Sequence, residues 1–258
     1  MHEILTTQPR EGLVLDLGSK QGSFRREATP ATVVRFDRQR PAEPVADPFV
    51  QGDASALPFR DHCFEAIVAN HSLEHLDDLD GSLREIGRVI RPQGAIFVSV
   101  PDASTITDKL YRWVLRGGGH VNAFTSPEEL VRRIAGATGL KHVATRTLWS
   151  SLSFLNRRYW PRRLRRLLCL GAGYEWSLFL YVWASRRVDR WLHLRTGVYG
   201  WAFYFGEVPG NVETADRVNV CIRCGSGTPS RLLKPRFRGI PVYRCPECGA
   251  TNPFTEDV

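Results

Sequence analysis

Three carboxylates stand where the first three predicted strands of this 258-residue chain end. Asp16 lies near the end of the first strand, Asp37 closes the second, and Asp53 follows the third. The turn after Asp16 contains Gly18 and Gly22, and glycine there permits positive φ and close approach of a ligand. A carboxylate after the second strand of an open α/β sheet can bind ribose hydroxyls. Because the turn lacks the glycine spacing of a pyrophosphate loop, we expect a nucleoside without phosphates.

Four of the six cysteines form two C-x2-C pairs near the C-terminal end, separated by 20 residues. This number and spacing of thiolates is typical of a tetrahedral zinc site, with disulfides as the alternative. Four thiolates leave no open coordination position, so the ion would stabilise a small zinc ribbon rather than catalyse a reaction. The predicted zinc ligands are Cys221, Cys224, Cys245 and Cys248.

Three histidines could accept a proton near neutral pH, because the unperturbed pKa of histidine is about 6.5. His71, Glu74 and His75 have i, i+3, i+4 spacing and could share one helix face. For these residues, catalysis, packing and metal binding stay open as alternatives. His120 follows the glycines 117–119 and lies either on an acceptor-side loop or on an ordinary one.

Short β-branched runs alternate with amphipathic stretches, which predicts parallel strands joined by helical crossovers. The expected strands include 13–17, 32–37, 65–70, 95–100, 141–149 and 199–207. One expected helix carries apolar residues at helical spacing from Leu79 to Ile90. Another begins after Ser126 as N-cap, with Pro127 at its first position, and ends at Gly139.

Several motifs in the expected order resemble the class I S-adenosylmethionine-dependent methyltransferases, in particular the methyltransferase type 11-like branch. They are DLGSKQG (16–22), GDASALPFRDHCFE (52–65), LREIGRVIRPQG (83–94) and, more weakly, HVNAFTSPEELVRRIAGATGL (120–140). The resemblance covers roughly residues 10–150 and 199–207. It implies a Rossmann-like, seven-stranded, mostly parallel α/β sheet with an antiparallel last strand.

The resemblance also implies S-adenosyl-L-methionine as cofactor and assigns residues to it. The implied cofactor-binding residues are Asp16, Gly18, Ser19 and Gly22 at the methionine part, Asp37 at the ribose, Asp53 and Ala54 at the adenine, and Asn70 near the sulfonium. The catalytic candidates are His75 and His71, which stand where the family has residues facing the methyl group, and His120, on the candidate acceptor-side loop. Lys20 replaces the middle glycine of the loop, where it could pair with the cofactor's carboxylate.

A basic, tryptophan-rich segment at about 150–198 is expected as an insertion between two strands. Residues 141–195 hold 12 Lys and Arg against two acids, a net charge of +10 in a chain whose total is +8. Residues 167–184 carry one charge, but a membrane span there would separate strand 199–207 from its sheet. Two shorter helices hinged at 171–173 therefore fit better.

Three interpretations of residues 157–187 stay open: a lipid-facing cap over the acceptor site, a structural cap with a solvated basic face, and a nucleic-acid contact. The first would bring the protein to a membrane surface peripherally. The third is less favoured because the aliphatic content exceeds what phosphate contact needs.

We therefore predict a methyltransferase domain at 1–211 and a zinc ribbon at 212–258, in a cytoplasmic protein without a secretory signal. The expected reaction is methyl transfer to a small-molecule, glycan or lipid-linked acceptor. RNA methylation and a non-catalytic binding module are the alternatives, whereas the loop spacing disfavours an NAD-dependent enzyme.

Overall fold

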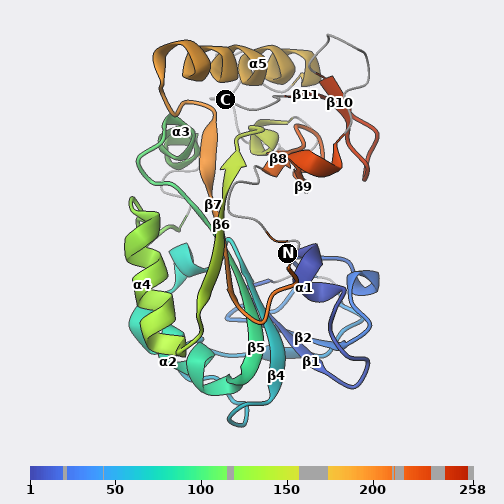
Figure 1. The fold of residues 1–258 in the computed structure, drawn as a ribbon, viewed down its shortest axis with the longest axis vertical. Coiled ribbons are helices and arrows are strands. Elements are labelled where there is room, and N and C mark those ends of the chain that lie inside the picture. Colours follow the sequence, from blue (N-terminus) through green and yellow to red (C-terminus); the bar gives the residue numbers. More distant parts are fainter. Residues whose placement is uncertain are drawn as a thin grey trace. The chain divides into compact units, whose positions relative to one another are not determined.

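The computed structural model describes residues 1–19, 22–42, 44–114, 119–156, 174–210, 212, 218–233 and 242–254. The chain divides into two compact units (Figure 1), of which the first comprises Met1–Pro101, Gly119–Thr145 and Trp201–Thr214. The second comprises Asp102–Gly118, Arg146–Gly200 and Ala215–Val258. Lys20 and the hinge expected at 171–173 lie outside the described residues. The domain boundary between 211 and 212 stays a prediction.

The first unit is built on a mostly parallel sheet with the order β3-β2-β1-β4-β5-β7-β6. Its strands are β1 (Leu13–Leu17), β2 (Thr32–Asp37), β3 (Phe49–Gln51), β4 (Phe64–Asn70), β5 (Ile90–Pro101), β6 (His142–Trp149) and β7 (Val198–Gly206). Strands β3, β2, β1, β4 and β5 pair in parallel. The Rossmann-like fold class is thereby confirmed, and the strands expected from the sequence are present.

Among its described residues, the first unit has three α-helices and two short 3₁₀ helices. They are α1 (His2–Leu5), α2 (Leu79–Val89), α4 (Pro127–Thr138), η1 (Arg26–Ala28) and η2 (Leu73–His75). Helices α2 and α4 lie beside each other along the sheet (Figure 1). A Cβ on Gly87 would lie 2.3 Å from the carbonyl oxygen of Ala137, so glycine permits their close approach.

Local sequence signals account for the ends of these helices. The Ser126 hydroxyl accepts a hydrogen bond from the Glu129 amide, and α4 ends at Gly139 with a φ of 70°, which confirms the predicted helix. Helix α2 ends one residue earlier than expected, because Ile90 is extended and begins β5. Helix α3 (Ile106–Val114) was not among the helices expected from the sequence.

The second unit combines α3 and α5 (Glu175–Leu192) with short strands. These strands are β8 (Val218–Val220), β9 (Gly227–Pro229), β10 (Val242–Arg244) and β11 (Thr251–Pro253), and the 3₁₀ helices are η3 (Ser153–Leu155) and η6 (Ser230–Leu232). Strands β6 and β7 continue into this unit, where β8 pairs in parallel with the end of β6 and antiparallel with β9. Strands β10 and β11 form a separate antiparallel pair.

Helix α5 is the longest element of the basic insertion among the described residues, which also include η3. It packs Leu178 and Val182 against Leu152, Leu155 and Ile222. The first of the two expected helices falls outside the described residues. Among the described helices, none has the length and apolar character needed to cross a membrane.

Candidate active site and metal centre

The carboxyl ends of β1, β2, β3 and β4 meet through backbone contacts. The Gly18 amide donates a hydrogen bond to the Phe36 carbonyl at 2.7 Å, and the Gly52 amide donates to the Asp37 carbonyl at 3.2 Å. Gly18 has a φ of 71°, and a Cβ there would lie 2.5 Å from the Cβ of Ser72. These contacts bring the predicted loop and the ends of β2, β3 and β4 together at the edge where open α/β sheets bind ligands.

Asp16 is fully buried and holds the glycine loop closed. Its Oδ2 accepts hydrogen bonds from the Ser23 amide at 2.9 Å and from Nη1 of Arg35 at 2.8 Å. Arg35 also binds Asp47, with an Nη2–Oδ2 distance of 2.6 Å. Burial raises the pKa of Asp16, while Ser23 and Arg35 act in the opposite direction. A Cβ on Gly22 would lie 1.8 Å from Nη1 of Arg35, so this buried network depends on glycine at that position.

The carboxylates expected at the ribose and the adenine each receive a backbone hydrogen bond. Asp37 is buried at the end of β2, and its Oδ1 accepts from the Gln39 amide at 2.8 Å. Oδ1 of Asp53 accepts from both the amide and the hydroxyl of Ser55, and these bonds lower the pKa of Asp53. Both side chains are therefore held as oriented carboxylates at neighbouring strand ends.

The other residues expected at the cofactor lie along the same edge. Oδ1 of Asn70, the last residue of β4, accepts from the Ser99 hydroxyl at 2.7 Å. The Ser19 hydroxyl donates to the Asp16 carbonyl at 3.2 Å, and Ala54 is buried directly after Asp53.

Two of the catalytic candidates, His71 and His75, follow β4, and His120 lies on the segment that is hydrogen-bonded to η2. The rings of His75 and His120 meet edge to face, with centroids 4.9 Å apart. His71 has a φ of 53°, and its Nδ1 lies 3.5 Å from Oε1 of Glu74. The structure thus brings His75 and His120 together and sets His71 against the buried Glu74.

The four predicted zinc ligands cluster in the second unit, within 4.8 Å of one another. The Sγ atoms of Cys221 and Cys248 lie 3.6 Å apart, as do those of Cys224 and Cys245. A tetrahedral site with Zn–S bonds of about 2.3 Å requires an S–S separation of about 3.8 Å. The cluster therefore fits a zinc ion held by four thiolates.

Both C-x2-C pairs end in the same backbone turn. The Gly225 amide donates to the Cys221 carbonyl at 3.0 Å, and the Gly249 amide donates to the Cys245 carbonyl at 2.9 Å. These glycines have φ angles of 72° and 70°, which explains why glycine follows each pair.

Two arginines that the sequence analysis did not single out join the cysteine cluster to α5. Arg223 binds both carboxylate oxygens of Glu175, at 2.6 and 2.8 Å, and donates to the Cys248 carbonyl at 3.2 Å. Nη1 of the buried Arg186 donates to Oδ1 of Asn219 and to the Pro253 carbonyl, both at 2.9 Å. The sequence contained a signal for Arg223, since it stands inside a C-x2-C pair.

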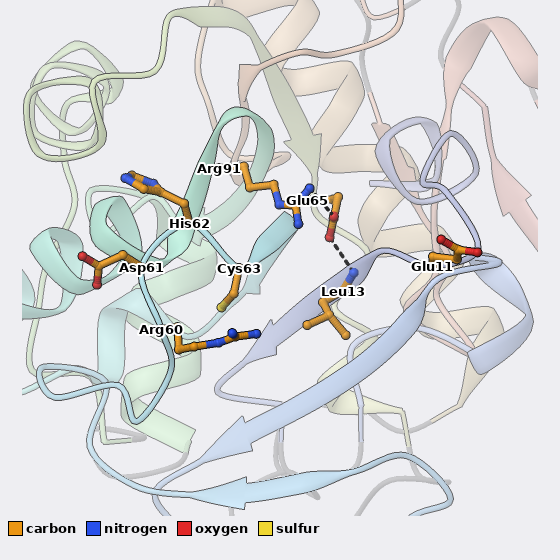
Figure 2. Close-up of a pocket in the computed structure, with 8 residues that line it drawn as sticks. All are labelled: Glu11, Leu13, Arg60, Asp61, His62, Cys63, Glu65 and Arg91. Carbon is orange, nitrogen blue, oxygen red and sulfur yellow. Dashed lines mark hydrogen bonds and ion pairs between the residues drawn. The ribbon is translucent and has the colours of Figure 1, made fainter.

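A hollow of about 330 Å³ lies at the opposite ends of β1 and β4 (Figure 2). Its lining is mostly charged, and Glu65 there accepts from the Leu13 amide at 2.5 Å and pairs with Arg91 at 3.0 Å. Because ligands of such sheets bind outside the carboxyl ends of the strands, this hollow is not the expected cofactor site.

Comparisons with known proteins point to one family. Residues 15–98 match the family described as "Methyltransferase domain". The malonyl-[acyl-carrier protein] O-methyltransferase of Pseudescherichia vulneris is 27% identical over 139 residues, which are 50% of this chain and 55% of that protein. A demethylmenaquinone methyltransferase of Mycobacterium tuberculosis is 27% identical over 139 residues, 50% of this chain and 57% of that protein. The chain thus spans about half the length of these relatives.

Solved structures agree on the fold. A SAM-dependent methyltransferase from Archaeoglobus fulgidus aligns with a TM-score of 0.51 at 17% identity, covering 76% of this chain and 86% of that one. The MccD protein aligns with a TM-score of 0.50 at 18% identity, covering 76% and 90%.

Proposed function

We propose that this chain transfers a methyl group from S-adenosylmethionine to a small-molecule, glycan or lipid-linked acceptor, since residues 15–98 match the methyltransferase domain family. The observation that carries the proposal is the meeting of four strand ends around Gly18, Asp37, Asp53 and Asn70. This edge offers two oriented carboxylates and a backbone turn that a ligand can approach closely.

The residues present fit the cofactor's chemistry. Asp37 and Asp53 would bind hydroxyl and amino groups of the nucleoside, with the buried Ala54 beside the base. Gly18 and Ser19 would line the methionine part. Asp16 would act through the loop, because Ser23 and Arg35 occupy one oxygen of its fully buried carboxylate.

Bound S-adenosylmethionine supplies a methyl carbon that its sulfonium already activates. The protein's task is then to align the acceptor and to remove a proton where one must leave. We assign proton removal to His75, assisted by His120 and His71. The hydrogen bond between Nδ1 of His75 and the Gly119 carbonyl supports this role, because it leaves Nε2 as the basic nitrogen.

We assign a structural zinc ion to Cys221, Cys224, Cys245 and Cys248. The matched S–S separations and the paired glycine turns support it. The ion would cross-link the ribbon, whose apolar cluster is small.

We further propose that residues 157–187 contact a membrane surface peripherally, and α5 supports this. The face of α5 opposite the buried Leu178 and Val182 exposes Trp176 by 66% and Trp191 by 78%. Arg187 lies on this face, with its guanidinium carbon 4.7 Å from the centroid of the Trp183 ring. Tryptophan and arginine on one helix face suit the headgroup region of an anionic bilayer.

A labelling experiment tests the acceptor class. Zinc-loaded protein is incubated with methyl-labelled S-adenosylmethionine and, separately, with an organic extract of membranes, a pool of water-soluble metabolites and total RNA. We expect label in the lipid or metabolite product. Label in RNA alone would make RNA the acceptor and overturn the proposal, as would no transfer to any pool.

A further inference from the structure

Glu74, His75 and His120 bring one carboxylate and two imidazoles together within the first unit. One ligand atom of each residue lies within 4.8 Å of those of the other two. Helical spacing in the sequence groups His71, Glu74 and His75 instead. It does not include His120, which comes from a separate segment of the chain. The fold, rather than helical spacing, therefore creates this cluster.

Backbone hydrogen bonds fix the segment 119–122 against η2. The Val121 and Asn122 amides donate to the Glu74 carbonyl at 2.8 and 3.0 Å. Nδ2 of Asn122 donates to the carbonyls of Leu73 and Leu76, at 3.0 and 2.7 Å. These four bonds hold His120 beside His75 without relying on the histidine rings.

The environment of the Glu74 carboxylate is a separate indication that a cation binds here. Its side chain is only 2% exposed, and its buried Oε2 has no hydrogen-bond partner among the described residues. The other oxygen, Oε1, lies 3.5 Å from Nδ1 of His71. A carboxylate removed from water is unfavourable unless donors or a cation compensate its charge.

The orientation of His75 also suits a metal ligand. A carbonyl oxygen only accepts, so the 3.0 Å contact of Nδ1 with Gly119 makes Nδ1 the donor. This leaves the lone pair of Nε2 available. Metal-binding histidines commonly have their second ring nitrogen held by a carbonyl in this way.

We propose that Glu74, His75 and His120 bind one divalent transition-metal ion. Two imidazoles and one carboxylate suit ions such as Mn²⁺, Fe²⁺, Co²⁺ and Zn²⁺ and leave coordination positions open. Bonds of about 2.1 Å allow two ligand atoms at most about 4.2 Å apart, so small side-chain rotations close the site. His71 would be a positioning residue that orients the Glu74 carboxylate.

Open positions on this ion would take an oxygen or nitrogen of the acceptor and would make its proton more acidic, so that the proton leaves to water. This last step rests on the proposed function, which puts the methyl donor at Asn70, the end of β4, and η2 begins three residues later at Leu73. The binding of the ion does not rest on it. With the ion bound, Nε2 of His75 would be a metal ligand, and the proton removal assigned to His75 above would belong to the protein without the ion.

Metal content and Mn²⁺ titration test the site in the full chain. We expect the protein, dialysed after Mn²⁺ loading, to hold two metal equivalents by mass spectrometry, one at the four cysteines and one here. In a titration with Mn²⁺, the electron paramagnetic resonance signal measures the free ion. The difference from the added amount should correspond to one Mn²⁺ bound per chain. Glu74→Gln and His120→Asn should each hold one equivalent less and bind Mn²⁺ at least tenfold more weakly. His2→Asn, which changes an exposed histidine in α1, should match the wild type.

Failure of this proposal and failure of the proposed function are distinguishable. Wild-type protein that takes up no Mn²⁺ beyond the cysteine site overturns the metal site, as do variants that bind Mn²⁺ as the wild type does. S-adenosylhomocysteine binding is measured on the same samples. Its retention in Glu74→Gln shows that the variant is folded, whereas its absence from the wild type overturns the proposed function alone.

Discussion

Nη1 of Arg35 lies 2.8 Å from Oδ2 of Asp16, and both side chains are buried between β1, β2 and the glycine loop. Arg35 also neutralises Asp47, so one guanidinium serves two buried carboxylates. Because the same guanidinium occupies the space where a side chain on Gly22 would lie, the loop's conformation and the ion pair depend on each other.

Replacing Arg35 should therefore destabilise the first unit strongly. Arg35→Met leaves the fully buried Asp16 without its cation and leaves Asp47 with only the half-exposed Arg26, so we expect a loss of about 3–5 kcal/mol in the free energy of unfolding. Arg91→Met removes the half-exposed partner of Glu65 and should change the free energy of unfolding by only about 0–1 kcal/mol. Urea unfolding of both variants checks this. If both variants lost the same free energy of unfolding, the buried ion pair would stabilise the protein no more than the exposed one.

Gly22→Ala should disrupt the loop, because its Cβ would overlap Arg35 and its φ of 103° is unfavourable for alanine. We expect destabilisation and a loss of S-adenosylhomocysteine affinity. Gly136→Ala is the matched control. It lies inside α4 with no atom within 4 Å of the new Cβ, so it should stabilise the protein by about 0.4–1 kcal/mol. The midpoint temperature of thermal unfolding should fall for Gly22→Ala and rise for Gly136→Ala.

Removing zinc should loosen α5. Its first turn is held by the ion pair between Glu175 and Arg223, which stands inside a C-x2-C pair, and Arg186 is bonded to the β11 backbone. We expect a chelator to release one zinc equivalent and to accelerate hydrogen exchange in 175–192, while β4 stays protected. Unchanged exchange in α5 after zinc release would contradict this coupling.

The exposed face of α5 should control membrane binding. Trp176→Ser and Trp191→Ser should each weaken co-sedimentation with anionic vesicles by at least about 1 kcal/mol, roughly fivefold. Leu232→Ser, an equally exposed apolar residue on η6, should leave binding unchanged. Vesicle binding that all three variants retain would exclude this face as the contact.

The strands and helices of the first unit can be predicted largely from local sequence signals. The side-chain clusters that tertiary contacts build cannot. Strands β1 and β4, and β5 from Ala95 onward, are near-continuous apolar runs because both faces of a parallel sheet are covered. Ser126, Pro127 and Gly139 marked α4. Helix α3 also has a local signal, which was not recognised in the sequence: the Thr105 hydroxyl accepts a hydrogen bond from the Asp108 amide at 3.2 Å.

The pairing of His120 with His75 could not have been predicted, because no periodicity relates a loop to a distant 3₁₀ turn. Arg35 carried a usable signal, since a charged residue inside the apolar run TVVRFD requires a buried partner. Its partners Asp16 and Asp47 depend on the fold. The two C-x2-C pairs were informative because four thiolates and a tetrahedral ion constrain one another strongly.

The central claim is that the carboxyl ends of β1 to β4 bind the methyl donor. Calorimetric titration with S-adenosylhomocysteine tests it most directly, on the wild type, Asp37→Ala and Glu11→Gln, whose substitution lies at the opposite end of the sheet. We expect saturable binding by the wild type and Glu11→Gln, and affinity at least about tenfold lower, about 1.4 kcal/mol, for Asp37→Ala. No binding by the wild type at millimolar ligand, or undiminished binding by Asp37→Ala, would contradict it.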